Sequence, residues 1–425
     1  MFKKLLSITL AALMVLSFAA VFTGCGSNNS SSSSSGESSG KSAESLKFGF
    51  IYLHDENSTY DNNFLTAAKE ACEKMGVEMI NKTNIDESDA CKEAALDLVD
   101  QGCDIIFADS FGHEDFMIEA AKANPDVQFL HATGTKAHTE KLDNFHNAFA
   151  SIYEGRYLAG VAAGMKINEM IEAGKFTKDE AKMGYVGAHP YAEVKSGYTS
   201  FYLGAKSVCP SVTMDVTFTG SWYDETAEKE AAQKLITNGA VLVSQHADSM
   251  GAPTACETAK VPNVSYNGST ESACPETFIV SSRINWAPYL EHCIKAVQDG
   301  TAIETDWVGT VSDGSVQLTD FGKKAPAAKT VESVEAAKKG LEDGSIHVFD
   351  VSTFTVTVTA DKNVNAKVDA DGHLTSYMAD VDSDAAYTAD TEVVKDGYFH
   401  ESESRSAPYF DIQIDGINLL DVNFG

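Results

Sequence analysis

Strand-like and helix-like segments alternate along this chain from residue 46, and that alternation limits the fold more than any other feature. Residues 46–53 form an apolar run of strand length, and residues 62–75 carry apolar side chains at helical spacing before Gly76. The same order continues with strands expected at 77–80, 104–108 and 127–132, and helices at 91–99 and 116–123. Because strand–helix–strand units close right-handed onto a parallel sheet, we expect an α/β fold.

The pattern begins again after a long helix expected at residues 152–171. Strands are expected at 182–186, 212–218, 241–244 and 264–266, with helices at 193–208, 226–238 and 254–260. Two units of the same order predict two lobes, each a doubly wound parallel sheet, with a ligand cleft outside the carboxyl ends of the strands. We expect hinge crossovers near residues 149–152, 282–285 and 307–309.

The domain boundaries follow from this pattern. Lobe 1 is expected at residues 46–150 with about 284–307, where residues 287–298 read as a helix. Lobe 2 is expected at residues 151–283 with about 308–345, with helical spacing after Lys324. Residues 346–425 predict a β-rich acidic extension, in which the segment 354–359 (FTVTVT) alternates like a strand.

The first 45 residues predict where the protein works. Lys3 and Lys4 precede an uncharged apolar stretch and a Thr-Gly-Cys sequence, which is typical of an export signal at residues 1–24 with a lipidated Cys25. Residues 25–45 are rich in Ser and Gly and predict a flexible tether. A membrane-spanning anchor is the alternative. We expect a protein that is lipid-anchored at the extracytoplasmic face of the cell membrane.

Charge and cysteine content exclude several functions. The chain has 32 basic and 62 acidic residues and a net charge of −30, which opposes binding to nucleic acid. The seven cysteines after Cys25 are odd in number and contain no CxxC pair, which argues against a zinc site. We expect buried free thiols. The alternative is a disulfide between cysteines that are near each other in sequence, Cys91 with Cys103 or Cys256 with Cys274.

Polar loops follow five of the expected strands, at residues 54–62, 109–115, 187–193, 220–224 and 245–249. Nearly every loop combines an aromatic or histidine side chain with a carboxylate. Aromatic rings stack on flat ligands, and carboxylates accept hydrogen bonds from hydroxyl groups. The loops therefore suit a flat, hydroxylated, uncharged ligand such as a nucleoside. The alternative for each single residue is that it only caps the following helix.

Five segments carry a family resemblance: FADSFGHEDFMIEAAKANPDVQFLHATG, NAFASIYEGRYLAGVAAGMKI, MGYVGAHPYAEVKSGYTSFYLGAKSV, TFTGSWYDETAEKEAA and LVSQHADS. Together they resemble the basic membrane protein family, the lipoprotein substrate-binding components of ABC importers, which include purine nucleoside receptors. The resemblance covers about residues 46–325. It implies a type I periplasmic-binding-protein fold, a nucleoside ligand, ABC permease and ATPase partners, and a monomer.

The resemblance also implies roles for particular residues. Tyr60 and Asp61 stand where the family has an aromatic residue followed by Asn, and Asn267 stands where many members have Asp. Other residues of the polar loops complete the candidate site, together with Trp286, which follows the strand expected near residue 283. The candidate ligand-binding residues are Tyr60, Asp61, Asn62, Ser110, Phe111, Tyr191, Glu193, Trp222, Asp248, Asn267 and Trp286.

Other functions receive less support. The chain has no GxGxxG, GxxxxGK[ST], GxSxG or HExxH motif, so an enzyme is not expected, nor is a cofactor. Residues 380–391 resemble a calcium loop, but Ala385 replaces the required Gly, which favours a solvated acidic loop, and no metal site is expected. A sensor that feeds a signalling partner, or a sugar-binding protein of the same fold, remains the alternative.

Overall fold

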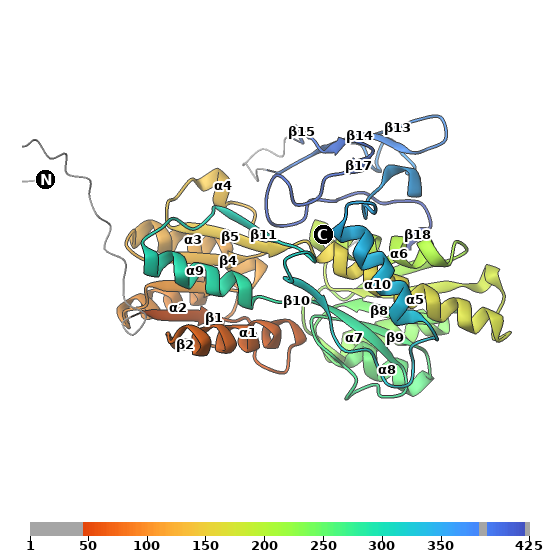
Figure 1. The fold of residues 1–425 in the computed structure, drawn as a ribbon, viewed down its shortest axis with the longest axis horizontal. Coiled ribbons are helices and arrows are strands. Elements are labelled where there is room, and N and C mark those ends of the chain that lie inside the picture. Colours follow the sequence, from red (N-terminus) through yellow and green to blue (C-terminus); the bar gives the residue numbers. More distant parts are fainter. Residues whose placement is uncertain (1–45, 382–388, 421–425) are drawn as a thin grey trace, which may run out of the picture. The chain divides into compact units, whose positions relative to one another are not determined.

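A computed structural model describes residues 46–381 and 389–420 (Figure 1). The expected signal peptide, Cys25 and the tether lie outside the described residues, as does most of the acidic segment after Asp380. Lobe 1 is built on six parallel strands in the order β11-β5-β4-β3-β1-β2. These strands are β1 (Lys47–Ile51), β2 (Glu78–Lys82), β3 (Ile105–Ala108), β4 (Gln128–Ala132), β5 (Phe145–Ala150) and β11 (Asp306–Gly309).

Helices cover both faces of the lobe 1 sheet. Phe48 of β1 and Phe107 of the neighbouring β3 pack with α1 on one face, while Ile106 and Phe129 pack with α2 and α3 on the other. Such alternation of apolar residues on two faces defines a doubly wound sheet. The helices are α1 (Thr59–Met75), α2 (Asp89–Asp100), α3 (Glu114–Ala123), α4 (Ala137–Glu140) and α9 (Ala287–Asp299), with a 3-10 turn at η2 (Phe111–His113).

Strand β5 was not predicted because polar residues interrupt its apolar pattern. His146 and Asn147 are nevertheless buried. The two ring nitrogens of His146 bond to the Glu304 carbonyl at 3.0 Å and the Gln128 side chain at 2.9 Å, and the Asn147 side chain accepts the Ala137 N–H. Because both His146 nitrogens and the Asn147 side-chain oxygen have partners, these polar side chains are tolerated inside the sheet.

Lobe 2 has seven strands in the order β12-β10-β9-β8-β6-β7-β18. Five central strands and β18 run parallel, and β12 is antiparallel to β10. The strands are β6 (Lys182–Gly187), β7 (Thr213–Phe218), β8 (Leu242–His246), β9 (Asn263–Tyr266), β10 (Phe278–Ile284), β12 (Val316–Leu318) and β18 (Ile417–Leu419). The helices are α5 (Ile152–Glu172), α6 (Ala192–Val208), α7 (Glu225–Thr237), α8 (Gly251–Ala259) and α10 (Thr330–Glu342), with η3 at Lys178–Glu180.

The chain passes between the two sheets three times. It leaves β5 for α5 at Ser151, leaves β10 for α9 at Asn285, and leaves β11 for β12 at Thr310. Helices α5 and α6 then pack so closely that a Cβ atom on Gly160 would lie 2.1 Å from the carbonyl oxygen of Phe201. Glycine at this contact lets the two backbones touch. The predicted two-lobed α/β fold is confirmed.

Besides β18, the described part of the C-terminal extension forms short strands. They are β13 (Ala366–Val368), β14 (Leu374–Ala379), β15 (Thr391–Glu392), β16 (Val394–Lys395) and β17 (Tyr398–Phe399), preceded by η4 (Val351–Thr353). The predicted strand at residues 354–359 was wrong. Its Thr355 and Thr357 hydroxyls donate to the Asp415 carboxylate at 2.8 Å each. These side-chain hydrogen bonds hold the segment in place of the backbone ladder that a strand would form.

The extension is packed against lobe 2. The Tyr198 hydroxyl of α6 donates to Gln413 at 3.1 Å, and β18 pairs with β7 of the lobe 2 sheet. Within the extension, the Phe410 ring stacks on Phe349 with centroids 4.3 Å apart. Elsewhere the seven cysteines of the described residues are free, buried thiols, as favoured from the sequence. In the described part of the chain, none of the helices combines the length and apolar character needed to cross a lipid bilayer.

Candidate functional site

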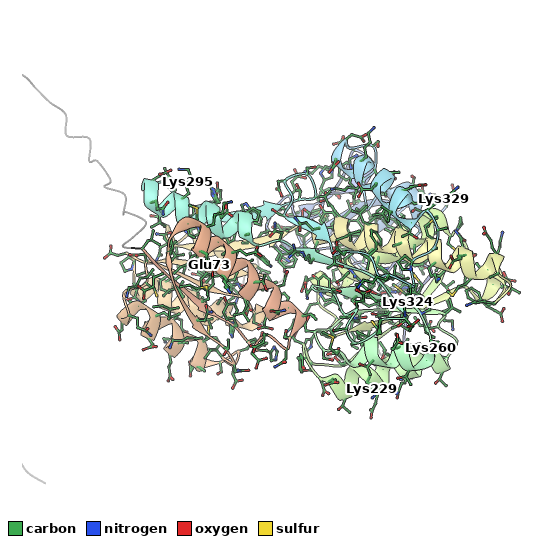
Figure 2. All side chains as sticks on the ribbon, turned by 60° about the horizontal axis from the view of Figure 1, so that its bottom comes forward. Glu73, Lys229, Lys260, Lys295, Lys324 and Lys329 are labelled. Atoms are coloured by element: carbon green, nitrogen blue, oxygen red, sulfur yellow. The ribbon has the colours of Figure 1, made fainter. Side chains whose placement is uncertain are left out.

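A narrow slot lies between the lobes at the carboxyl ends of their central strands. Lobe 1 lines it through the loops after β1, β3 and β4, and lobe 2 through the loops after β6, β7 and β8. The free space in the slot is about 20 Å³, which is room for about one water molecule. A ligand therefore needs the lobes or the slot side chains to move apart. Figure 2 shows Lys229 on α7 and Lys295 on α9; neither residue lines this slot.

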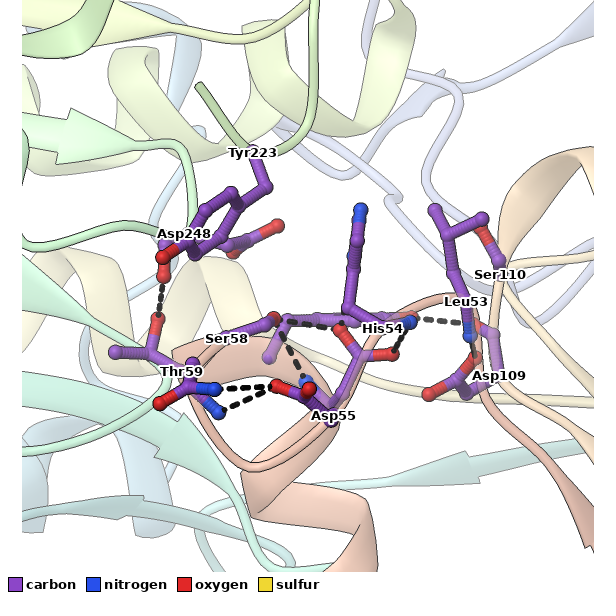
Figure 3. A network of polar contacts seen from close by, with 12 residues as sticks. Leu53, His54, Asp55, Ser58, Thr59, Asp109, Ser110, Tyr223 and Asp248 are labelled. Carbon is purple, nitrogen blue, oxygen red and sulfur yellow. Dashed lines mark hydrogen bonds and ion pairs between the residues drawn. The ribbon is translucent and has the colours of Figure 1, made fainter. Parts of the chain in front are cut away.

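The loop after β1 is held by a buried carboxylate. Asp61 Oδ1 accepts the His54 N–H at 2.7 Å, and Oδ2 accepts the Ser58 hydroxyl at 2.5 Å (Figure 3). Ser58 is also the N-cap of α1 and accepts the Asp61 N–H. Burial alone would raise the pKa of Asp61, but the hydrogen bonds from His54 and Ser58 outweigh it and lower the pKa. Asp61 is therefore ionised, and it fixes the loop that carries His54.

Tyr60 and Asp109 meet below that loop. The Tyr60 hydroxyl donates to the Asp109 carbonyl at 2.7 Å, and the Asp109 carboxylate accepts the Leu53 N–H at 3.2 Å. Complete burial, and then the nearby Asp61 charge, raise the pKa of Asp109 well above its ordinary value. The raised pKa favours the neutral form of Asp109, because a second buried charge beside Asp61 is unfavourable.

On the lobe 2 side, two acidic residues reach the slot. Glu193, in the first turn of α6, lies 3.0 Å from His246 Nε2 at the end of β8. Asp248 accepts a hydrogen bond from the Asn267 side chain at 3.1 Å, and Asn267 has a φ of 65°, a left-handed conformation that Asn tolerates. Burial, and then the charges of Asp61 and its acidic neighbours, raise the pKa of Asp248 well above its ordinary value.

Asp248 also connects the lobes through its backbone. Its carbonyl oxygen accepts the N–H of Thr59 at 3.0 Å and the Thr59 hydroxyl at 3.2 Å (Figure 3). A neutral Asp248 carboxyl can both donate and accept a hydrogen bond, which suits a hydroxyl group of a ligand.

Aromatic side chains from both lobes surround one end of the slot. The Phe111 ring of lobe 1 stacks on Tyr191 of lobe 2 with centroids 5.3 Å apart, and Tyr191 lies 6.0 Å from Trp222. Phe111 is 40% and Tyr191 42% exposed, so both rings present apolar area to solvent. Such rings can stack on a flat ligand from opposite sides of the slot.

The structure brings seven of the eleven candidate residues together in the slot: Tyr60, Asp61, Ser110, Phe111, Glu193, Trp222 and Asp248. Tyr191 lies beside it, and Asn267 lies behind Asp248. Asn62 is exposed on α1 and lines a different crevice. Trp286 is buried in lobe 1, with its ring stacked on Phe64 at 4.4 Å, because the helix that it precedes belongs to lobe 1.

Four further residues line the slot and were not among the candidates. They are Leu53, His54, Thr133 and His246. His54 and His246 lie in the polar loops that were singled out, so the loop pattern contained their signal. Thr133 follows β4 with a φ of 64°. Its loop carries no aromatic residue beside a carboxylate, so the pattern used for the other loops could not find it.

The fold and the interlobe slot define a substrate-binding protein with two α/β lobes. A solved ABC transporter solute-binding protein from Aeropyrum pernix K1 has the same fold, with a TM-score of 0.59 and 19% identity over 74% of this chain and 95% of that chain. The sequence model of the Bmp family, described as ABC transporter substrate-binding protein PnrA-like, matches residues 51–347. This chain belongs to that family.

Two relatives agree with this assignment. A purine-binding protein of Brucella abortus (strain 2308) is 32% identical over 72% of this chain and 83% of its own length. An ABC transporter nucleoside-binding protein of Lactococcus lactis subsp. cremoris is 27% identical over 62% of this chain and 70% of its own length. The protein is therefore the substrate-binding component of an ABC importer. It works outside the cytoplasm, binds a small molecule for a permease, and is not an enzyme.

Proposed function

We propose that this protein binds a purine nucleoside in the interlobe slot and delivers it to its permease. One observation carries the proposal: rings and buried acidic groups of opposite lobes converge on one slot. Phe111 and Trp222 would stack on the base, and Asp248 and Glu193 would bond its edge or the ribose hydroxyls. The names of the purine-binding and nucleoside-binding relatives support this ligand class.

The lobes would close on the ligand by rotation at the three crossovers near Ser151, Asn285 and Thr310. Ligand contacts to both lobes would favour the closed form, because a ligand shifts a population by its difference in affinity. We further propose that the chain acts as a monomer, held by a lipid on Cys25 and the tether at residues 25–45.

Mass spectrometry of the small molecule that co-purifies with the protein tests the proposal. Calorimetry against purine nucleosides, free bases and pentoses should then show the highest affinity for a nucleoside. Trp222→Ala should weaken that binding by about tenfold with an unchanged unfolding midpoint, because one stacking surface is lost. Tight binding of a free pentose, with no affinity for any nucleoside, would contradict the proposal.

The anchor needs a separate test. Membrane fractionation should find the wild type with the membranes and Cys25→Ser in the soluble extracellular or periplasmic fraction. An unchanged distribution would refute the lipid anchor and leave the ligand proposal standing.

A further inference from the structure

The slot continues into a second, larger cavity that we call the chamber. Phe111, Thr133 and Glu193 line both spaces. The chamber has about 500 Å³ of free space, against about 20 Å³ in the slot. Pockets for small molecules commonly have ~300–1,000 Å³. The chamber is therefore large enough to take part of a ligand whose other part lies in the slot.

The C-terminal extension forms one side of the chamber. Tyr377, Arg405, Tyr409 and Asp411 of the extension face Tyr191 and Thr135 of the two lobes across it. The family match ends at residue 347, so this wall belongs to a part of the chain that the family model does not describe. The chamber is thus lined by three parts of the chain: lobe 1, lobe 2 and the C-terminal extension.

The wall is held firmly in place. Both carboxylate oxygens of Glu401 accept backbone N–H groups, from Tyr409 at 2.7 Å and Phe410 at 3.0 Å. The backbone N–H and hydroxyl of Ser406 donate to Asp306 of lobe 1 at 2.9 and 2.8 Å. The Tyr153 hydroxyl of α5 in lobe 2 donates to the Glu401 carbonyl at 3.4 Å, so the wall is attached to both lobes and is part of the folded structure.

The charges of the wall select among ligands. Glu193, Asp380 and Asp411 bring three carboxylates to the lining, and Asp411 is paired with Lys195 of α6. The one guanidinium, Arg405, donates to the carbonyl oxygens of Ala407 and Pro408 at 3.2 Å each and lies among the charges of Glu401 and Asp380. The Asp380 carboxylate offsets its positive charge in part. An anionic group would meet net negative charge here, whereas hydroxyl or cationic groups would find acceptors.

We infer that the chamber is a second subsite, which takes an uncharged hydroxylated or a cationic substituent carried by the ligand in the slot. The inference rests on the proposed function, and it adds that the natural ligand is larger than an unsubstituted nucleoside. The exposed rings of Phe111 and Tyr191, at the junction of the two spaces, would contact the ligand where the substituent begins.

A variant that fills the chamber tests the inference. Ala192 begins α6, lines the chamber and does not line the slot, so Ala192→Phe would place a ring in the chamber alone. Thr226→Phe is the matched control, because Thr226 is exposed in the first turn of α7 and lines neither space. Thermal unfolding of each full-length variant verifies that it folds.

Calorimetry would compare adenosine with N6-(4-hydroxybenzyl)adenosine, S-adenosylmethionine and adenosine 5′-monophosphate. The wild type should bind at least one of the two uncharged or cationic derivatives as tightly as adenosine, and should bind the monophosphate about tenfold more weakly. Ala192→Phe should weaken the accepted derivative by about tenfold and leave adenosine unchanged, because only the derivative enters the filled space. Thr226→Phe should change neither.

Rejection of both derivatives by a wild type that binds adenosine would overturn the subsite. So would an equal effect of Ala192→Phe on adenosine and on the derivative. If no nucleoside binds the wild type, the proposed function fails, and the same variants are then titrated with glucose and maltose. If Ala192→Phe loses affinity for maltose but not for glucose, the second subsite is supported. If the variant loses affinity for neither sugar, or if the wild type binds neither sugar, the second subsite is refuted.

Discussion

The N–H and the hydroxyl of Thr59 both donate to the carbonyl oxygen of Asp248, at 3.0 and 3.2 Å. Thr59 begins α1 of lobe 1, and Asp248 follows β8 of lobe 2. The pair therefore joins the two lobes directly, beside the slot, and can exist only while the lobes are closed. A contact of this kind contributes to ligand affinity without touching the ligand.

Thr59→Val removes the hydroxyl and keeps the backbone bond. Loss of one hydrogen bond of about 0.5–1.5 kcal/mol should lower ligand affinity by about two- to tenfold, since the closed form becomes less populated. Calorimetry measures the affinity. Thr66→Val, on an exposed position of the same helix, is the control and should bind like the wild type. Equal affinities of Thr59→Val and the control would show that this contact does not favour closure.

Asp248→Asn should bind ligand far better than Asp248→Ala. Burial and then the Asp61 charge raise the pKa of Asp248, which favours the neutral carboxyl, and Asn resembles that form. Ala instead leaves the Asn267 amide without its partner, which costs about 1–3 kcal/mol. Titrations at pH 6 and 7 check this order. Equal losses in the two variants would mean that the ionised carboxylate is the binding form.

Glu401→Gln should change how stability depends on pH. Burial raises the pKa of Glu401 to about 7, so the folded protein holds a proton that the unfolded chain loses near pH 4.5. The stability from this group is present below pH 4.5 and is lost as pH rises to 7, at up to ~1.4 kcal/mol per pH unit. Relative to the wild type, Glu401→Gln should therefore gain about 1–3 kcal/mol between pH 5 and 7.5.

Urea unfolding at both pH values provides that measurement. The difference between the two proteins isolates Glu401, because the other titrating groups are common to both. A constant difference across this range would show that Glu401 titrates normally in the folded state.

Gly160→Ala should destabilise the protein by about 1–3 kcal/mol, because the added Cβ would lie 2.1 Å from the Phe201 carbonyl oxygen and would force α5 and α6 apart. Gly155→Ala on the same helix is the comparison. Its nearest new contact is a Val316 methyl at 2.8 Å, which can rotate away, so its loss should be smaller. Urea midpoints followed by circular dichroism decide the order, and a reversed order would contradict the close helix contact.

Most of the fold could be predicted because apolar periodicity is a local property. Elements such as α5 and β7 lie where the pattern placed them. Strand β5 was not predicted because it contains His146, whose partners, Gln128 and the Glu304 carbonyl, are distant in sequence. In segment 354–359 apolar and polar side chains alternate as in a strand, with Phe354 and Val356 buried. Among the described residues, however, no neighbouring strand forms a continuous ladder of backbone hydrogen bonds with it.

The sequence could predict the site residues that lie in loops directly after a predicted strand. Ser110 and Trp222 could be placed because each follows a strand whose end faces the cleft. Trp286 also follows a strand, but the chain changes lobes at that point and carries the ring into the lobe 1 core. The chamber could not be foreseen, since it depends on how the extension packs across both lobes.

Strand β18 has a consequence for export and folding. Its residues Ile417–Leu419 pair with Met214–Val216 of β7, so the last described strand completes a sheet whose other strands end at Leu318. Until residues 417–419 have crossed the membrane, β7 has an unpaired edge, which is a site for aggregation. A translocation product that lacks β18 would thus expose the unpaired edge of β7. Chaperones that act late in export would therefore matter more for this protein than for a chain in which each lobe is completed early in the sequence.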